Sequence, residues 1–186
     1  MSGRALIVGM ALAGASAAAH GADWSMEPSA SRLEFVATFE RNAALGVFRE
    51  FDARMRFDPG KPEGGRLDVT IKVGSADMSG ADVNKAIHGP EWFDSARFPQ
   101  AEFHAAEIGR SGANRFLARG TLSLKGRQQP VEVPFTWTGT ADAATIAGEI
   151  GIDRRSFGIG TGEWTSTNVI GAEVKVRFNV RLRKVN

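Results

Sequence analysis

Apolar and polar residues alternate one by one through most of this chain, and this pattern constrains its fold more than any other feature. In residues 33–39, for example, Leu33, Phe35, Ala37 and Phe39 alternate with mainly polar neighbours. Successive side chains of a β-strand point to opposite faces, so a period of two predicts a strand with one buried face. The same alternation recurs in residues 51–57, 67–73, 101–105, 116–124, 131–137, 146–152 and 170–182.

The connections between these segments favour an all-β fold. Turn residues such as Pro59-Gly60 follow the predicted strands, and few segments have helical spacing. Regular strands of this kind are typical of an antiparallel sandwich or a closed barrel. We predict about eight strands, and a barrel of that size encloses either packed side chains or one slender ligand.

Residues 81–93 break the alternation. Val83, Ala86 and Ile87 recur at helical spacing, and Pro90 follows at a position that starts another turn. We therefore predict one or two short helices that close one end of the barrel. Trp92 or Phe93 is expected to anchor this lid.

The N-terminal residues 1–21 have the pattern of a signal peptide. Arg4 precedes a run of small and apolar residues that continues to Ala19. We expect cleavage after Ala19 or Gly21, export to the periplasm, and a single domain of residues 22–186. The apolar run is too short and too rich in alanine to span a bilayer, so we expect a protein that does not cross the membrane.

Composition excludes several classes of function. The chain has no cysteine, and its three histidines are not at metal-ligand spacing, so we expect neither a disulfide nor a bound metal. A formal net charge of +2 leaves no basic surface for nucleic acid. A nucleophile elbow of the type glycine-x-serine-x-glycine is missing after the signal peptide. We therefore expect no enzyme and no required cofactor.

A glycine cluster late in the chain resembles a phosphate-binding loop only superficially. Gly158, Gly160 and Gly162 are followed by Glu163 where the dinucleotide fingerprint needs glycine. A negative charge there would repel phosphate. We interpret the cluster as a tightly bent connection between strands.

The aromatic residues suggest two kinds of interior. The chain has 12 phenylalanines and 4 tryptophans but no tyrosine, so an aromatic wall would carry no phenol hydroxyl. Such a wall suits a hydrocarbon chain, but the same rings could pack against each other. The residues alone favour the packed core.

The order of motifs resembles the YceI-like family of periplasmic, lipocalin-like proteins over nearly the whole chain after the signal peptide. The matching motifs are Trp24, Pro28, Ser31 and Phe35; Gly46, Phe48, Phe51, Phe57 and Asp58; Phe93-Asp94, Phe98-Pro99 and Phe103; Gly120-Thr121-Leu122; and Arg154 with Phe157-Gly158-Ile159. The resemblance implies a lipocalin-like antiparallel barrel that binds a polyisoprenoid, an isoprenoid quinone or a related lipid. It therefore favours a ligand tunnel over a packed core.

With this resemblance, the inward apolar residues become candidates for the tunnel wall. These candidates are Phe35, Phe39, Phe51, Met55, Val69, Ile71, Phe93, Phe103, Leu122, Phe135, Trp137, Ile150, Phe157, Val176 and Phe178. The small inward residues Ala118 and Gly148 are expected to mark where the tunnel has room. Candidates for contacts with a ligand head group at the mouth are Asn84, His88, Arg154 and Trp164.

Two stretches differ from the common family pattern. Asn84-Lys85-Ala86-Ile87-His88 replaces the family's usual arginine, histidine and leucine before Phe93-Asp94. Residues 158–164 look like a subgroup found beside membrane cytochromes of the b561 type. An accessory role to such a cytochrome is therefore one alternative function, and an enzyme acting on an apolar substrate is a less favoured one. A second copy of the chain is a further candidate partner.

Overall fold

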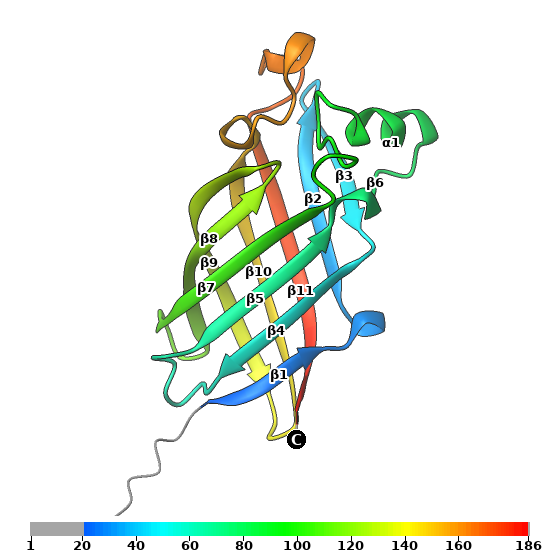
Figure 1. Cartoon of the computed structure of the whole chain (residues 1–186). Coiled ribbons are helices and arrows are strands. Elements are labelled where there is room, and N and C mark those ends of the chain that lie inside the picture. Colours follow the sequence, from blue (N-terminus) through cyan, green and yellow to red (C-terminus); the bar gives the residue numbers. More distant parts are fainter. Residues whose placement is uncertain (1–20, 186) are drawn as a thin grey trace, which may run out of the picture.

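The computed structural model describes residues 21–185, which form a tall antiparallel β-barrel (Figure 1). The predicted signal peptide lies, apart from Gly21, outside the described residues. The strands are β1 (Ala22–Met26), β2 (Arg32–Phe39), β3 (Asn42–Phe48), β4 (Phe51–Phe57), β5 (Arg66–Lys72), β6 (Ala76–Asp77), β7 (Gln100–Arg110), β8 (Arg115–Leu124), β9 (Arg127–Gly139), β10 (Ala143–Asp153) and β11 (Glu173–Lys184). One α-helix, α1 (Ala81–His88), and four short 3-10 helices complete the described part.

Eight of these strands close the barrel. They pair in the order β1-β4-β5-β7-β8-β9-β10-β11, and β11 pairs back with β1. Strands β2, β3 and β6 extend the sheet because β11 also pairs with β2. The all-β, antiparallel barrel of about eight strands is confirmed. The alternation had not indicated β1, β3 or β6, since each is short or mixes apolar residues on both faces.

The end of the barrel opposite α1 is filled by aromatic rings. We call this cluster the aromatic plug, and it consists of Trp24, Phe57, Phe116, Phe135 and Trp137. The Phe57 ring lies 4.9 Å from the Phe116 ring and 5.0 Å from the Trp137 ring, centroid to centroid. The indole nitrogen of Trp24 donates a hydrogen bond of 3.1 Å to the Phe57 carbonyl. This half of the barrel is therefore a packed core.

The structure corrects the expectation that Ala118 and Gly148 mark free space. Ala118 is fully buried within the main core cluster. A Cβ atom built on Gly148 would lie 2.3 Å from the Pro134 carbonyl oxygen and 2.6 Å from the Phe178 ring. Both positions are small because neighbouring atoms already occupy the space.

Helix α1, which the sequence predicted, lies at the other end of the barrel beside β6 (Figure 1). Phe93, in the turn that follows it, packs its ring 6.2 Å from Phe35 and 5.9 Å from Phe48. Asn84 donates to the Asp77 carboxylate at 2.8 Å and accepts from the Met78 amide at 2.7 Å. These contacts fasten the helix to the end of β6.

Acid should loosen this fastening. Hydrogen bonds from Asn84, the Ser79 amide and Arg49 lower the pKa of Asp77 to about 2, whereas an aspartate in an unfolded chain titrates near 3.9. A folded-state pKa below the unfolded value stabilises the fold above about pH 4, and this contribution is lost as the pH falls towards 2. The protection factors of the Ala81–His88 amides against hydrogen exchange should therefore fall across that range more than those of the β8 amides. In Asp77→Asn this extra loss of protection should disappear; its persistence would assign the effect to other carboxylates.

Candidate functional site

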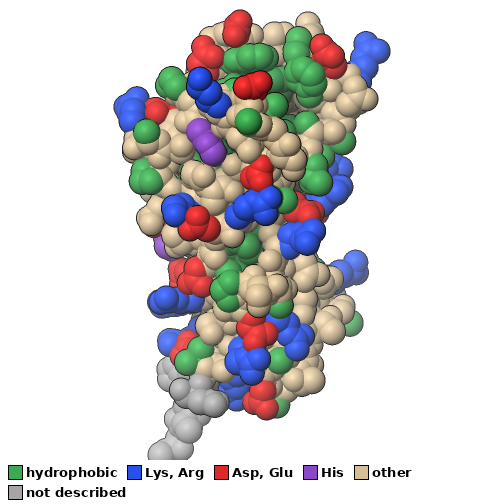
Figure 2. All heavy atoms as spheres, turned by 90° about the vertical axis from the view of Figure 1, so that its right-hand side faces the viewer, with side chains coloured by type: hydrophobic (Ala, Val, Ile, Leu, Met, Phe, Trp, Pro, Cys, Tyr) green, Lys and Arg blue, Asp and Glu red, His purple; other side chains and the backbone are tan. Residues whose placement is uncertain are grey.

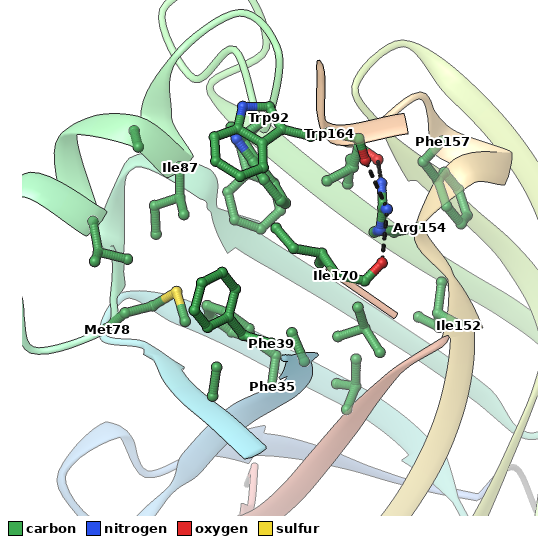
Figure 3. Close-up of a pocket in the computed structure, with 18 of the residues that line it drawn as sticks. Phe35, Phe39, Met78, Ile87, Trp92, Ile152, Arg154, Phe157, Trp164 and Ile170 are labelled. Carbon is green, nitrogen blue, oxygen red and sulfur yellow. Dashed lines mark hydrogen bonds between the residues drawn. The ribbon is translucent and has the colours of Figure 1, made fainter. Parts of the chain in front are cut away.

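A cavity of about 550 Å³ lies beneath α1, at the end of the barrel opposite the aromatic plug (Figure 3). Its walls come from β2, β3, α1 and the turn after it, and from β8, β10, β11 and the loop between the last two. The lining residues are Phe35, Ala37, Phe39, Ala44, Leu45, Phe48, Met78, Val83, Ala86, Ile87, Trp92, Phe93, Leu124, Ile152, Arg154, Phe157, Ile159, Trp164, Ile170, Val174 and Val176.

The wall of this cavity is almost entirely hydrocarbon. Among the lining residues that the structure describes, Arg154 alone carries a charge. Cavities of about 300 to 1,000 Å³ with mainly apolar walls are typical of small-molecule sites. The arrangement suits an apolar molecule and offers few groups for acid–base chemistry.

Arg154 is buried and holds the loop between β10 and β11. Its five N–H groups make five hydrogen bonds of 2.8 to 3.0 Å, all to backbone carbonyls, and these belong to Ile159, Gly160, Trp164, Ile170 and Gly171. A guanidinium has five N–H donors, so the chain itself uses all of them. Arg154 therefore builds the cavity wall and leaves no donor for a ligand head group.

The surroundings of Arg154 keep its charge inside the protein. Burial lowers the pKa of Arg154, but a guanidinium stays protonated in proteins. The adjacent carboxylate, Asp153, pairs with Arg155 instead. The Trp92 ring lies 5.9 Å from the guanidinium carbon, so carbonyl dipoles and an aromatic face surround the charge.

The glycine cluster has a clear structural role at this place. Gly160 has a φ of +73°, and a Cβ atom there would lie 2.1 Å from an Arg154 nitrogen. Only glycine gives both the left-handed backbone and the space that the guanidinium needs. The prediction of a tight connection agrees with this geometry.

Two loops meet over the cavity and form its roof, which we define as residues 89–94 and 158–166. The amides of Gly160 and Thr161 donate to the Glu91 carbonyl at 2.8 and 3.0 Å. Lys125 bridges the same loops, because its ammonium donates to the carbonyls of Pro90 and Gly158 at 2.8 Å each. The rings of Trp92 and Trp164 lie 5.7 Å apart (Figure 3). The roof is therefore fastened by backbone contacts as well as by apolar packing.

Exposed apolar side chains surround the opening of the cavity. Phe39 and Leu45, from the β2–β3 hairpin, and Val83 of α1 line the cavity and are also 44 to 54% exposed. Hydrophobic side chains gather at the α1 end of the molecule in Figure 2. A molecule could enter the cavity past this rim without crossing a polar surface.

The structure divides the predicted tunnel residues into two groups. Those that line the cavity are Phe35, Phe39, Phe93, Phe157 and Val176. Those outside the lining are Phe51, Met55, Val69, Ile71, Phe103, Leu122, Phe135, Trp137, Ile150 and Phe178. Most of the second group belongs to the main core or packs against it, because the barrel is filled below the cavity. One tunnel through the whole barrel is therefore not formed.

The predicted mouth residues also divide. Arg154 and Trp164 line the cavity, whereas Asn84 and His88 do not. Asn84 bonds Asp77 and Met78, and a ring nitrogen of His88 lies 3.0 Å from the Ala76 carbonyl oxygen. Both of these side chains hold α1 against β6. A head-group contact by Asn84, His88 or Trp164 stays a prediction, whereas Arg154 has no donor left for one.

Sequence reasoning missed much of the lining. Ala37, Leu124, Ile152 and Val174 share the inward face of strands that the alternation had identified. The helical spacing of Val83, Ala86 and Ile87 likewise pointed to an apolar helix face. The sequence pattern thus indicated that these residues point inward. It did not indicate at which height along the barrel axis the interior is hollow.

Other binding features of the described chain are few. No group of three or more histidine, cysteine, aspartate or glutamate residues within residues 21–185 is placed to hold a metal ion. In the same part of the chain, none of the helices has the length and apolar character needed to cross a bilayer.

Fold and site together define a lipocalin-like barrel with an apolar cavity that opens at one end. The model of the YceI-like domain matches residues 24–182. This chain belongs to the YceI-like family, and the resemblance inferred from its motifs is confirmed.

Solved structures support the same assignment. The crystal structure of BcnA from Burkholderia cenocepacia is 32% identical, with a TM-score of 0.82 over 84% of this chain and 98% of that one. A structure described as a polyisoprenoid binding domain from Saccharophagus degradans has a TM-score of 0.71 over 87% of this chain and 98% of its own. The second is only 16% identical, so it shows a likeness of fold.

Curated relatives match over shorter stretches. A UPF0312 protein of Azotobacter vinelandii is 33% identical over 94 residues, which cover 50% of this chain and 49% of that protein. A UPF0312 protein of Shewanella denitrificans is 28% identical over 145 residues, or 75% of this chain and 73% of that protein. The chain thus spans about half the length of the first relative.

Proposed function

We propose that this protein binds the chain of a polyisoprenoid, an isoprenoid quinone or a related lipid in the cavity beneath α1, without a catalytic step. The observation that carries the proposal is the apolar wall of this cavity of about 550 Å³. Among the described lining residues only Arg154 is charged, and all of its N–H donors bind backbone carbonyls. Such a wall recognises hydrocarbon and little else. The Saccharophagus degradans domain, which is described as polyisoprenoid binding, supports the same ligand class.

The energetics favour reversible binding. Each methylene group removed from water contributes about 0.8 kcal/mol, so one isoprene unit contributes roughly 3 to 4 kcal/mol before costs. A membrane solvates the same chain about as well as an aromatic wall does. The net drive to leave a bilayer is therefore close to zero, which suits a carrier or a store.

The setting of this activity is part of the proposal. The signal-peptide pattern of residues 1–21 supports a periplasmic location, and we propose that binding needs no cofactor. An accessory role to a membrane cytochrome of the b561 type, and a homodimer, stay predictions from the sequence.

Neighbouring residues of β11 provide a test. Val174 lines the cavity, whereas Lys175 lies on the exposed outer face. We expect Val174→Trp to reduce retention of geranylgeraniol at least tenfold, measured by native mass spectrometry, because the indole takes up space that the prenyl chain would occupy. Overpacking should cost no more than about 1 to 3 kcal/mol of stability, so thermal melting should still show a folded barrel.

Lys175→Trp is the matched control and should bind like the unchanged protein. Equal retention by both variants would place the site elsewhere.

A second experiment identifies the physiological ligand by extracting the lipids from protein purified out of its own host's periplasm. A polar extract without prenyl or acyl chains would contradict the proposed ligand class.

A further inference from the structure

The cavity ends abruptly partway along β11. Val174 and Val176 point inward and line it. Phe178, the next inward residue, does not, and Val180 and Leu182 beyond it belong to the packed core. The hollow part of the barrel therefore stops between Val176 and Phe178.

The Phe178 ring lies against Gly148 of the neighbouring strand, at the level where the cavity ends. The two residues are directly opposite each other in the β10–β11 pairing. A Cβ atom on Gly148 would lie 2.6 Å from the tip of the Phe178 ring. The missing side chain of Gly148 thus leaves a space that the ring fills, and Phe178 packs against the main core.

Two other strands lose contact with the cavity in the same way. On β10, Ile152 lines the cavity while Ile150, two residues earlier, packs against the core. On β8, Leu124 lines it while Leu122 is buried in the core. We call Leu122, Ile150 and Phe178 the cavity floor.

We propose that Phe178 sets the length of the prenyl chain that this cavity encloses. The inference rests on the proposed function and deepens it: the site takes an apolar segment of limited length, whether a short prenyl chain or the end of a long one. A cavity of this volume suits a ligand of about the size of a drug molecule. Carbon atoms beyond that length stay outside and gain no burial.

Affinity should therefore rise with chain length until the cavity is full and then stop rising. The test offers isoprenoid alcohols of two to eight units together, at equal concentration in one detergent, and counts the bound species by native mass spectrometry. For the unchanged protein we expect occupancy to level off at about three or four units. Longer alcohols partition more strongly into the detergent micelles, but this partition is the same for every variant. It therefore cancels when the occupancy profiles of two variants are compared.

Phe178→Ala should move the profile towards longer chains. The lost phenyl ring is about as large as one isoprene unit, so the levelling-off point should shift by about one unit. Two alcohols are compared: the longest one that the unchanged cavity encloses and the one that is a single isoprene unit longer. The bound amount of the longer alcohol relative to the shorter should rise about tenfold or more in Phe178→Ala. Val176→Phe, placed just above the floor, should shift the profile to shorter chains.

Val180→Ala is the matched control, because it removes buried methyl groups one inward position further from the cavity. Its profile should equal that of the unchanged protein. Melting curves verify that each variant is folded. If Phe178→Ala does not fold, Phe178→Leu replaces it in the test. The inference is overturned if occupancy in the unchanged protein keeps rising to eight units, or if the Phe178 and Val176 variants leave the profile unchanged. Failure of the unchanged protein to retain any alcohol would instead overturn the proposed function together with this inference.

Discussion

Replacement of Arg154 by methionine is expected to lower the free energy of unfolding by about 3 kcal/mol or more. The reason is that five backbone carbonyls would lose their donor at once. A buried acceptor left without a donor costs about 1 to 3 kcal/mol, and water will reach some of the five. A loss of 3 kcal/mol is a large part of the roughly 5 to 15 kcal/mol that stabilises a typical domain.

Ligand retention should fall with stability in this variant. Ile159, Trp164 and Ile170 line the cavity, and Arg154 holds the carbonyl of each one. Without the guanidinium, the connection between β10 and β11 loses five hydrogen bonds and keeps outer ones, such as those to Glu91 and Lys125, so it should move away from the cavity. The roof and one wall would then be lost together.

Denaturant unfolding with a matched neighbour tests this expectation. Arg155 is exposed and pairs with Asp153, so Arg155→Met should change stability by less than about 1 kcal/mol. Arg154→Lys keeps the positive charge but not the planar set of five donors, so it should resemble Arg154→Met. If Arg154→Lys were as stable as the unchanged protein, charge alone would account for the role of Arg154.

The fold was predictable because alternation is a local property. Whether Phe35 or Val176 points inward depends only on its position in a strand, and the turns between strands are marked by residues such as Pro59-Gly60. The exceptions are instructive. Strand β3 mixes Leu45, Gly46 and Val47 without a period of two, so its pairing with β2 and β6 defines it as a strand.

The site was predictable only in part, because a cavity is a property of packing and not of position. Alternation placed Phe35 and Phe135 on the same inner surface, but one lines a cavity and the other belongs to the aromatic plug. The difference depends on how many large rings meet at each level of the barrel. Gly148 illustrates the point, since a small residue suggested free space where the Phe178 ring already lies.

Arg154 marks a second limit of sequence reasoning. An arginine beside Asp153 and Arg155 reads as part of a solvated charged segment. Its burial requires five carbonyls from a loop that closes back over it. Those carbonyls are backbone groups, which carry no signature in the sequence apart from the glycines that allow the turn.

The aromatic plug should determine the stability of the barrel without touching the ligand. We expect Phe57→Ala to cost about 3 to 5 kcal/mol, the usual range for removing a buried phenylalanine. The Phe57 side chain is 1% exposed and packs on the rings of Phe116, Phe135 and Trp137. Few neighbours could move to fill the space, because each ring is fixed by the others.

Phe48→Ala is the matched comparison at the opposite end of the barrel. Phe48 lines the cavity and is partly exposed, so its removal enlarges an existing space and should cost less than half as much. Denaturant unfolding of both variants gives the two costs, and native mass spectrometry under folding conditions gives their ligand retention. We expect Phe57→Ala to be the less stable variant and to retain as much prenyl alcohol as the unchanged protein. Phe48→Ala should be the more stable variant, but the amount of prenyl alcohol that it retains should change. The opposite ranking of stabilities would mean that the core of this barrel lies beneath α1, and loss of binding in folded Phe57→Ala would mean that the ligand reaches the plug.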